Sequence, residues 1–201
     1  MKPSLSINGV DVYRGALSSS VQAALVAAAR QVAKVAPFFH PETKRGQQMS
    51  VRMTSAGAFG WISDRRGYRY DPTHPSGVPW PAIPDPMLAV WREFATVSKA
   101  PESCLINYYD ANARMGLHQD RDEASFEWPV VSVSLGDDAL FRVGTAEAPR
   151  PSQSVWLASG DVVVLQGHGR LAYHGVDRLR PGTSQLLPKG GRINLTLRVV
   201  T

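Results

Sequence analysis

Three residues that lie apart in the chain have the right chemistry to hold one metal ion. His118 and Asp120 are two positions apart, and His174 comes much later. Positions i and i+2 of a strand project from one face, so we expect His118 and Asp120 to lie side by side on a strand over residues 117–122. Two imidazoles and one carboxylate on one face of an octahedron leave sites open for substrate, as in non-haem Fe(II) oxygenases. The spacing therefore predicts an iron site that activates O2.

A His-x-Asp motif alone is weak evidence for a metal site, since it also arises by chance. The C-terminal segment strengthens the interpretation. Residues 192–199 alternate between polar and apolar side chains, and the polar ones are Arg192, Asn194, Thr196 and Arg198. A solvated outer face of an antiparallel sheet would give the same pattern. If this face points inward instead, the two guanidinium groups could each bind one carboxylate of a small keto-diacid that chelates the iron.

Short motifs along most of the chain resemble, in order and spacing, those of the AlkB-like branch of the Fe(II)/2-oxoglutarate dioxygenases. These motifs are Met49-Ser-Val, Gly60-Trp61, Gly67-Tyr68, Leu105-Ile-Asn107-Tyr-Tyr109, Leu117-His118-Gln-Asp120-Arg-Asp122-Glu123, Val131-Ser-Val-Ser-Leu-Gly136, Gly160-Asp-Val-Val-Val, Tyr173-His174-Gly175 and Arg192-Ile-Asn194-Leu-Thr-Leu-Arg198. The resemblance implies an enzyme that uses Fe(II) and 2-oxoglutarate, with O2 as co-substrate.

The resemblance also implies a role for each matching position of the centre. The implied iron ligands are His118, Asp120 and His174. Arg192 matches the anchor of the distal carboxylate of 2-oxoglutarate, and the other positions implied to bind this cofactor are Asn107, Tyr109, Asn194 and Arg198. This chain has Tyr108 where the family often carries arginine, and we expect that side chain to face away from the cofactor.

The substrate that the resemblance implies is an N-alkylated base such as 1-methyladenine or 3-methylcytosine in DNA, with RNA as an alternative. Hydroxylation of the methyl group would release formaldehyde and restore the base. Trp61 matches an aromatic that stacks on a flipped base, a contact worth about 1–3 kcal/mol, and Tyr68 matches a phosphate contact. Taken alone, Trp61 could equally be a core side chain. Met49 and Ser50 complete the implied substrate contacts.

Asp122 is the residue from which we expect base selectivity. It would share a strand face with His118 and Asp120, where a spare carboxylate could accept a hydrogen bond from the amino group of adenine or cytosine. The negative charge would also favour a base made cationic by methylation. The alternative is a solvated acid paired with Arg121 or Arg142. Because the base must leave its stack, we expect a preference for single-stranded DNA.

The elements that must position these residues fit a single domain of 201 residues. Ser18 is a suitable cap for a helical run that ends before Pro37, and Pro86 opens a second helix. We expect the helices and a nucleotide-recognition lid, which includes the alternating residues 49–53, to occupy about residues 1–100. Short alternating strands over about 104–201 predict a mostly β core, a double-stranded β-helix or jelly roll.

Composition indicates the kind of partner and the cellular compartment to expect. The excess of 22 basic over 17 acidic residues gives a net charge of +5, which favours a polyanionic partner. A single cysteine, Cys104, excludes an internal disulfide and fits a reducing compartment. Without an apolar secretory segment near residue 1, we expect a cytoplasmic monomer without a membrane partner.

Two alternatives to nucleic-acid dealkylation remain at this stage. A dioxygenase of the same fold could act on a protein or a small molecule, leaving Trp61, Tyr68 and Asp122 without their implied roles. A jelly roll of basic charge could also bind nucleic acid without catalysis. We expect the remaining histidines, His40, His74 and His168, to lie at the surface because of their Pro- and Gly-rich surroundings.

Overall fold

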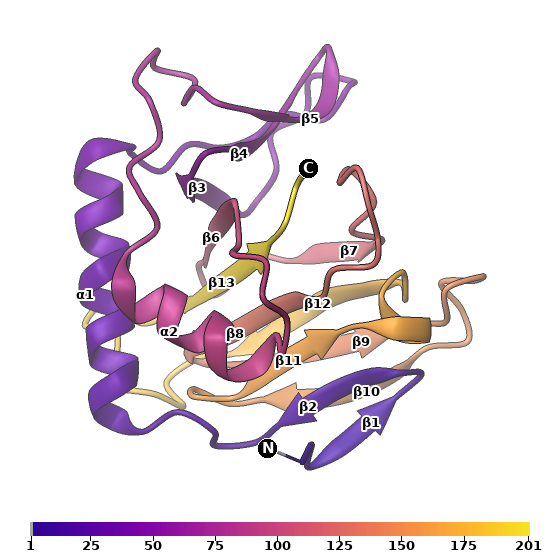
Figure 1. The fold of residues 1–201 in the computed structure, drawn as a ribbon. Coiled ribbons are helices and arrows are strands. Elements are labelled where there is room, and N and C mark those ends of the chain that lie inside the picture. The colour runs from indigo at the N-terminus through magenta and orange to yellow at the C-terminus, as the bar shows by residue number, and fades with distance from the viewer. Residues whose placement is uncertain (1) are drawn as a thin grey trace.

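The computed structural model describes residues 2–201, which form two antiparallel sheets, two α-helices and a separate hairpin (Figure 1). The helices are α1 (Ser19–Val35) and α2 (Asp85–Phe94), with a short 3-10 turn η1 (Gly167–Gly169). The strands are β1 (Leu5–Ile7), β2 (Val10–Tyr13), β3 (Arg52–Gly57), β4 (Gly60–Asp64), β5 (Gly67–Asp71), β6 (Ser103–Tyr109), β7 (Met115–His118), β8 (Val130–Gly136), β9 (Asp138–Val143), β10 (Gln153–Leu157), β11 (Val162–Leu165), β12 (His174–Arg180) and β13 (Arg192–Arg198).

The sheet order brings distant parts of the chain together. The larger sheet runs β1-β2-β11-β8-β13-β6-β3, and the smaller runs β10-β9-β12-β7. In the larger sheet β13 lies between β6 and β8, so Arg192 is opposite Tyr109 and Asn194 is opposite Asn107. This arrangement confirms the predicted jelly-roll core. Three strands from the N-terminal half, β1, β2 and β3, also join the larger sheet.

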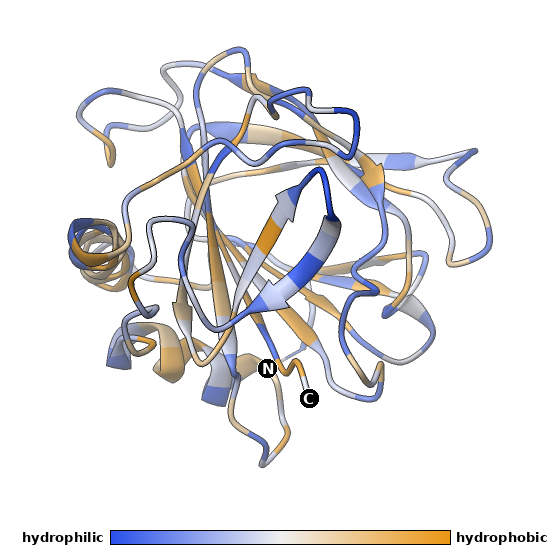
Figure 2. Cartoon of the chain, turned by 90° about the horizontal axis from the view of Figure 1, so that it is seen from above, coloured by the Kyte–Doolittle hydropathy of each residue, from blue (hydrophilic) through white to orange (hydrophobic). Residues whose placement is uncertain are grey.

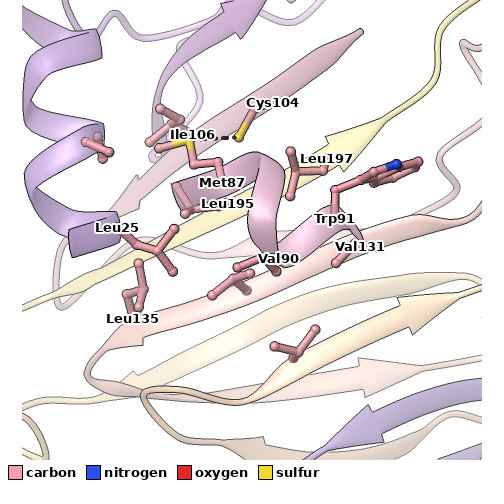
Figure 3. Packing of buried hydrophobic residues seen from close by; sticks show 14 of the residues in the cluster. Leu25, Met87, Val90, Trp91, Cys104, Ile106, Val131, Leu135, Leu195 and Leu197 are labelled. Carbon is pink, nitrogen blue, oxygen red and sulfur yellow. Dashed lines mark hydrogen bonds between the residues drawn. The ribbon is translucent and has the colours of Figure 1, made fainter. Parts of the chain in front are cut away.

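The two helices pack on one face of the larger sheet. Ser18 caps α1 as predicted, its hydroxyl accepting a hydrogen bond from the Val21 backbone N–H. Pro84 precedes α2, whose buried face meets α1. The side chains that fill this layer, shown in Figure 3, are Leu25, Met87, Val90, Trp91, Cys104, Ile106, Val131, Leu135, Leu195 and Leu197. The apolar face of β13 is thereby buried under the helices.

A second apolar layer lies between the two sheets. Its members include Val12, Val130, Phe141, Leu165 and Val176, contributed by strands of both sheets. Because the apolar residues of β13 face the helices, its polar residues must face this interior. The inward orientation is therefore imposed by the strand's alternation together with the helices that cover its other face.

The hairpin β4–β5 forms its own two-stranded sheet, and in Figure 1 it projects above the two larger sheets. Its turn, which contains Arg65 and Arg66, is strongly hydrophilic in Figure 2. The expected lid included residues 49–53, but Arg52 and Met53 belong to β3 at the edge of the larger sheet. The alternation at 49–53 thus reflects an edge strand that leads into the hairpin.

Some sequence predictions of local structure were wrong. The strand expected over 117–122 ends at His118, and β12 begins only at His174 instead of Leu171. His74 is buried, not exposed, because its ring bonds Ser76 and the carbonyl of Pro37 between the rings of Phe39 and Trp80. Within residues 2–201, neither helix has the length and apolar character needed to cross a bilayer.

Candidate metal centre and cosubstrate pocket

Strand pairing brings the two histidines of the candidate centre side by side. β7 and β12 are antiparallel neighbours, and His118 is directly opposite His174, with ring centroids 4.6 Å apart. Asp120 lies beyond the end of β7 in an irregular segment. The expectation that His118 and Asp120 share a strand face was therefore wrong. A loop rather than a two-residue strand repeat turns Asp120 toward the histidines.

The three side chains offer a donor set suited to one ion. Their ligand atoms all lie within 4.8 Å of one another, with Nε2 of His118 3.7 Å and Nε2 of His174 3.6 Å from Asp120. Nδ1–H of His118 donates to the carbonyl of Gly116 at 2.9 Å, and that of His174 to Ala172 at 3.0 Å. Both Nε2 lone pairs are thereby left free, which is the usual arrangement of metal-binding histidines.

Electrostatics keep His174 and Asp120 in their metal-binding protonation states. Burial, the largest cause, lowers the pKa of His174 to about 4, so its imidazole is neutral near pH 7. Burial alone would raise the pKa of Asp120, but the adjacent Arg198 guanidinium, with a smaller contribution from Arg170, holds it well below its usual range. A neutral imidazole and an ionised carboxylate are the forms that bind a metal.

A cavity of about 770 Å³ opens beside this cluster, and all the residues expected at the site line it. It lies between the two sheets and reaches the hairpin β4–β5. The expected residues that line it are Met49, Ser50, Trp61, Tyr68, Asn107, Tyr109, His118, Asp120, Asp122, His174, Arg192, Asn194 and Arg198. The polar face of β13 thus points into a pocket and not into bulk water.

Arg192 is a buried cation without a charged partner in the described part of the chain. Its residue is 2 % exposed, and its one hydrogen bond runs from Nη2 to the Ser134 hydroxyl at 3.0 Å. Nε and Nη1 have no partner, and the guanidinium carbon stands 5.2 Å from the ring centroid of Tyr109. Burial lowers the pKa of Arg192. Unpartnered donors of this kind fit the carboxylate of a bound acid.

Arg198 differs from Arg192, because internal groups already engage it. Its Nη2 lies 2.8 Å from Oδ2 of Asp120, and its Nη1 donates to the Tyr70 hydroxyl at 3.0 Å. Burial alone would lower the pKa of Arg198, but Asp120, Tyr70 and Glu123 raise it above its ordinary value. The expectation of one free guanidinium for each carboxylate is therefore met at Arg192 only.

Amides line the wall between the two arginines. Asn194 donates to the Ser132 hydroxyl and the Val133 carbonyl, and its Oδ1 accepts from Asn107 at 3.2 Å. The Oδ1 of Asn107 is buried without a partner. These hydrogen bonds hold the two amides in place in the cavity wall.

Glu123, Arg170 and Tyr70 also belong to the centre, and sequence reasoning gave them no role. Arg170 is 3 % exposed; it donates to the Asp120 carbonyl at 2.7 Å and lies 3.2 Å from Glu123. Glu123 in turn accepts from the Tyr70 hydroxyl at 2.6 Å. Glu123 stands within the quoted motif, but no spacing rule pairs it with Arg170 or with a hairpin tyrosine. The network fixes the loop that carries Asp120.

Replacing Glu123 with glutamine should lower the free energy of unfolding by about 2 kcal/mol, because hydrogen bonds to charged groups contribute about 1.5–3 kcal/mol each. The carboxylate now neutralises Arg170 and part of Arg198 in a buried setting. Chemical denaturation of the metal-free protein measures the change. Glu93→Gln on the exposed face of α2 is the matched control. Unchanged stability in Glu123→Gln would show that Arg170 does not depend on this charge.

The residues expected to contact substrate form a cluster at the hairpin side of the cavity. Trp61 stacks on Tyr68 with centroids 5.5 Å apart, and its Nε1 donates to Oδ2 of Asp122 at 2.8 Å. Asp122 therefore pairs with Trp61 and not with Arg121 or Arg142. Trp61 packs against the inner apolar layer on one side and lines the cavity on the other, so it is not a core side chain alone.

Comparison with known proteins agrees with this geometry. The family model of the 2OG-Fe(II) oxygenase superfamily matches residues 9–198. The chain is 52% identical over 98% of its length to the alpha-ketoglutarate-dependent dioxygenase AlkB homolog of Caulobacter vibrioides, of which it covers 90%. It is 39% identical over 96% of its length to the alpha-ketoglutarate-dependent dioxygenase AlkB of Escherichia coli, of which it covers 91%.

A solved structure gives the same result at the level of the fold. The structure of OsALKBH1 matches with a TM-score of 0.80 and 30% sequence identity, over 97% of this chain and 98% of that chain. The family match spans both the metal centre and the arginine-bearing strand β13. The chain thus belongs to the 2OG-Fe(II) oxygenase superfamily and, within it, is an AlkB-like Fe(II)/2-oxoglutarate-dependent dioxygenase.

Proposed function

We propose that this enzyme removes methyl groups from N-alkylated bases, 1-methyladenine and 3-methylcytosine, in single-stranded DNA, with RNA as a further substrate. The methyl group is hydroxylated, and the unstable product loses formaldehyde to restore the base. The observation that carries the proposal is one cavity that joins the His118–Asp120–His174 cluster to the Trp61–Tyr68 stack. The names of the relatives, AlkB and AlkB homolog, support it.

Residues on three sides of the cavity would divide the work. Bound Fe(II) supplies the oxidising chemistry, together with 2-oxoglutarate and O2. His118, Asp120 and His174 would hold the ion through two Nε2 atoms and a carboxylate oxygen. The unpartnered donors of Arg192 would bind the far carboxylate of 2-oxoglutarate and so fix the direction in which it enters. The apolar layer between the sheets keeps water out of the reacting end.

Arg198 and Asn107 would act at the near end of 2-oxoglutarate. Arg198 holds Asp120 in place through the 2.8 Å contact, and it presents positive charge where the keto-acid end would bind. The side chains of Asn107 and Tyr109 complete that wall. These residues act mainly by orientation, since a misplacement of 1 Å can cost about a hundredfold in rate.

The Trp61–Tyr68 stack would hold the extruded base. Trp61 is held by Tyr68, by Asp122 and by the inner apolar layer, so little side-chain entropy would be lost when a base binds beside it in the cavity. Nζ of Lys44 lies 5.6 Å from the ring centroid of Tyr68, which adds positive charge where a phosphate of the flipped nucleotide would lie. Single-stranded substrate avoids the cost of unpairing, a few kcal/mol.

The deciding experiment is formaldehyde release from single-stranded oligonucleotides that carry 1-methyladenine or 3-methylcytosine, with Fe(II), 2-oxoglutarate and O2. We expect turnover of both lesions, and slower turnover of the same lesions in duplex DNA. Absence of formaldehyde together with turnover of a protein or small molecule would favour the first alternative. Absence of any 2-oxoglutarate decarboxylation would favour a non-catalytic binder.

Asp122→Ala should lower kcat/KM for 1-methyladenine by about tenfold, since one base contact is worth about 1–3 kcal/mol. The neutral lesion 3-methylthymine should lose less, because the carboxylate favours a cationic base. Affinity for 2-oxoglutarate should not change. Steady-state kinetics on both lesions measure the ratio.

Asp122→Asn separates the two roles of this side chain, because an amide oxygen can still accept from Nε1 of Trp61. It should keep Trp61 in place and lose the charge preference alone. Equal losses on both lesions in Asp122→Ala, with no loss in Asp122→Asn, would show that Asp122 only supports Trp61. The predicted cytoplasmic location and monomeric state stay predictions.

A further inference from the structure

A second hollow lies beside the main cavity, on the outer side of the smaller sheet. Its volume is about 420 Å³, and it runs between the β7–β12 pair and the segment that carries Pro149 and Arg150. Residues 114–117 and 175–176 line both hollows. The β7–β12 pair therefore forms the wall between the main cavity and this outer groove, which is defined by the residues lining the second hollow. Because β7 is the edge strand of the smaller sheet, a polymer with one unit in the main cavity can reach the outer groove around the free edge of β7.

The outer groove is positively charged. Arg114, Arg142 and Arg150 line it against a single acid, Asp177. Arg142 donates hydrogen bonds from Nε and Nη2 to the neutral Ser152 hydroxyl. Its Nη1 lies 3.7 Å from Asp177, and Arg178 also lies 3.1 Å from this acid. Within residues 2–201, no carboxylate lies within ion-pair distance of Arg114 or Arg150. The positive charge is thus available to a ligand.

The floor of the outer groove has no bulky side chain where it meets the main cavity. A Cβ added at Gly116 would meet nothing within 4 Å, so the backbone of β7 is open to a ligand there. β7 is also the last strand of the smaller sheet, which leaves its outer backbone groups without a strand partner. A chain can therefore pass close to the backbone between the two hollows.

We propose that the outer groove holds the backbone of a single-stranded nucleic acid as it leaves the main cavity, with phosphates at Arg142 and Arg150. This inference rests on the proposed function and adds a site for the strand beyond the flipped base. The short way around the edge strand β7 and the sign of the charge select a polyanionic strand as the occupant. Guanidinium groups suit phosphates because their fork bonds two oxygens at once.

The test compares a methylated trinucleotide with an oligonucleotide that extends about ten nucleotides beyond the lesion on each side, within the range of single-strand site sizes. In the double variant Arg142→Gln, Arg150→Gln, we expect KM for the long substrate to rise about tenfold, with little change for the trinucleotide. Arg114 is left intact because it lines both hollows. The control is Arg30→Gln, Arg92→Gln on exposed helix surfaces.

Direct binding supplies a readout that does not depend on iron. Binding of an unmethylated long oligonucleotide is followed by fluorescence anisotropy at several salt concentrations. In the double variant the magnitude of the slope of log K against log salt should be smaller by about 1.4, because each of the two lost phosphate contacts contributes about 0.7. Equal losses on both substrate lengths, or no loss on either, would overturn the proposal. Competition by polyglutamate as strong as that by the oligonucleotide would overturn it too.

These outcomes are separable from failure of the proposed function. If wild-type protein leaves even the methylated trinucleotide unchanged, nucleic-acid dealkylation itself is wrong. If wild-type protein demethylates both lengths and the double variant matches it on both, the inference about the outer groove alone is wrong.

Discussion

Replacing Arg192 with methionine is expected to stabilise the metal-free protein and at the same time to weaken its binding of 2-oxoglutarate strongly. Arg192 is buried with one neutral hydrogen-bond partner, and Nε and Nη1 are unpartnered. Exchange of buried ionic groups for apolar ones of similar volume often stabilises a protein by about 1–4 kcal/mol. For a domain of this size, about 1 kcal/mol corresponds to 2–4 °C in Tm, so the thermal midpoint should rise by several degrees.

The same substitution should weaken 2-oxoglutarate binding by about 30-fold or more, because loss of one partner from a buried charge pair costs about 2–5 kcal/mol. Anaerobic calorimetry with Fe(II) and 2-oxoglutarate measures the affinity, and thermal denaturation with and without 2-oxoglutarate measures the stability. Arg192→Lys is the matched control: it keeps the charge without the fork, so its affinity should be intermediate. A lower Tm with unchanged affinity would assign Arg192 a structural role.

His174→Ala is expected to lower demethylation by about 1000-fold or more. A metal ion contributes several kcal/mol of transition-state stabilisation, and each 1.36 kcal/mol is tenfold in rate. The ring lies at the cavity wall beside His118 and bonds only the Ala172 carbonyl, so the fold should survive its loss. Formaldehyde release measures the rate, and far-UV circular dichroism checks the fold.

His168→Ala is the control for this prediction, because His168 is exposed in η1 and lies outside both hollows. It should retain full activity. Fe(II) binding followed by quenching of tryptophan fluorescence should weaken in His174→Ala and stay unchanged in the control. Preserved turnover in His174→Ala would remove this residue from the set of metal ligands.

The parts of the fold that sequence predicted well are those governed by local periodicity. Alternation along 192–199 predicts both that β13 is a strand and that Arg192 and Arg198 share one face. Whether that face points to water or to a cavity depends on α1 and α2, which cover the other side. The alternation alone therefore could not decide it, and the family motifs did.

The parts that sequence missed depend on contacts between remote segments. The sequence correctly placed Asp120 with the two histidines, but it assumed that a strand repeat would do this. In the structure Asp120 reaches the histidines from a loop. The pairing of Asp122 with Trp61 joins a loop to the hairpin, and Arg170 reaches Glu123 from the turn after η1. Such pairs leave no periodic signal in the chain. His74 was misplaced likewise, since proline-rich segments can also cover a buried ring.

Because His118 lies on the edge strand of the smaller sheet, metal binding should also stabilise the attachment of that strand. β7 has four residues and a neighbour on one side only, so its attachment is the weakest among the strands that carry the centre. An ion shared by His118 and His174 would clasp this border strand to β12 through side chains as well as amides. Without the ion, the wall shared by both hollows would be held by the backbone pairing of β7 with β12 alone, so local unfolding should begin at this border strand.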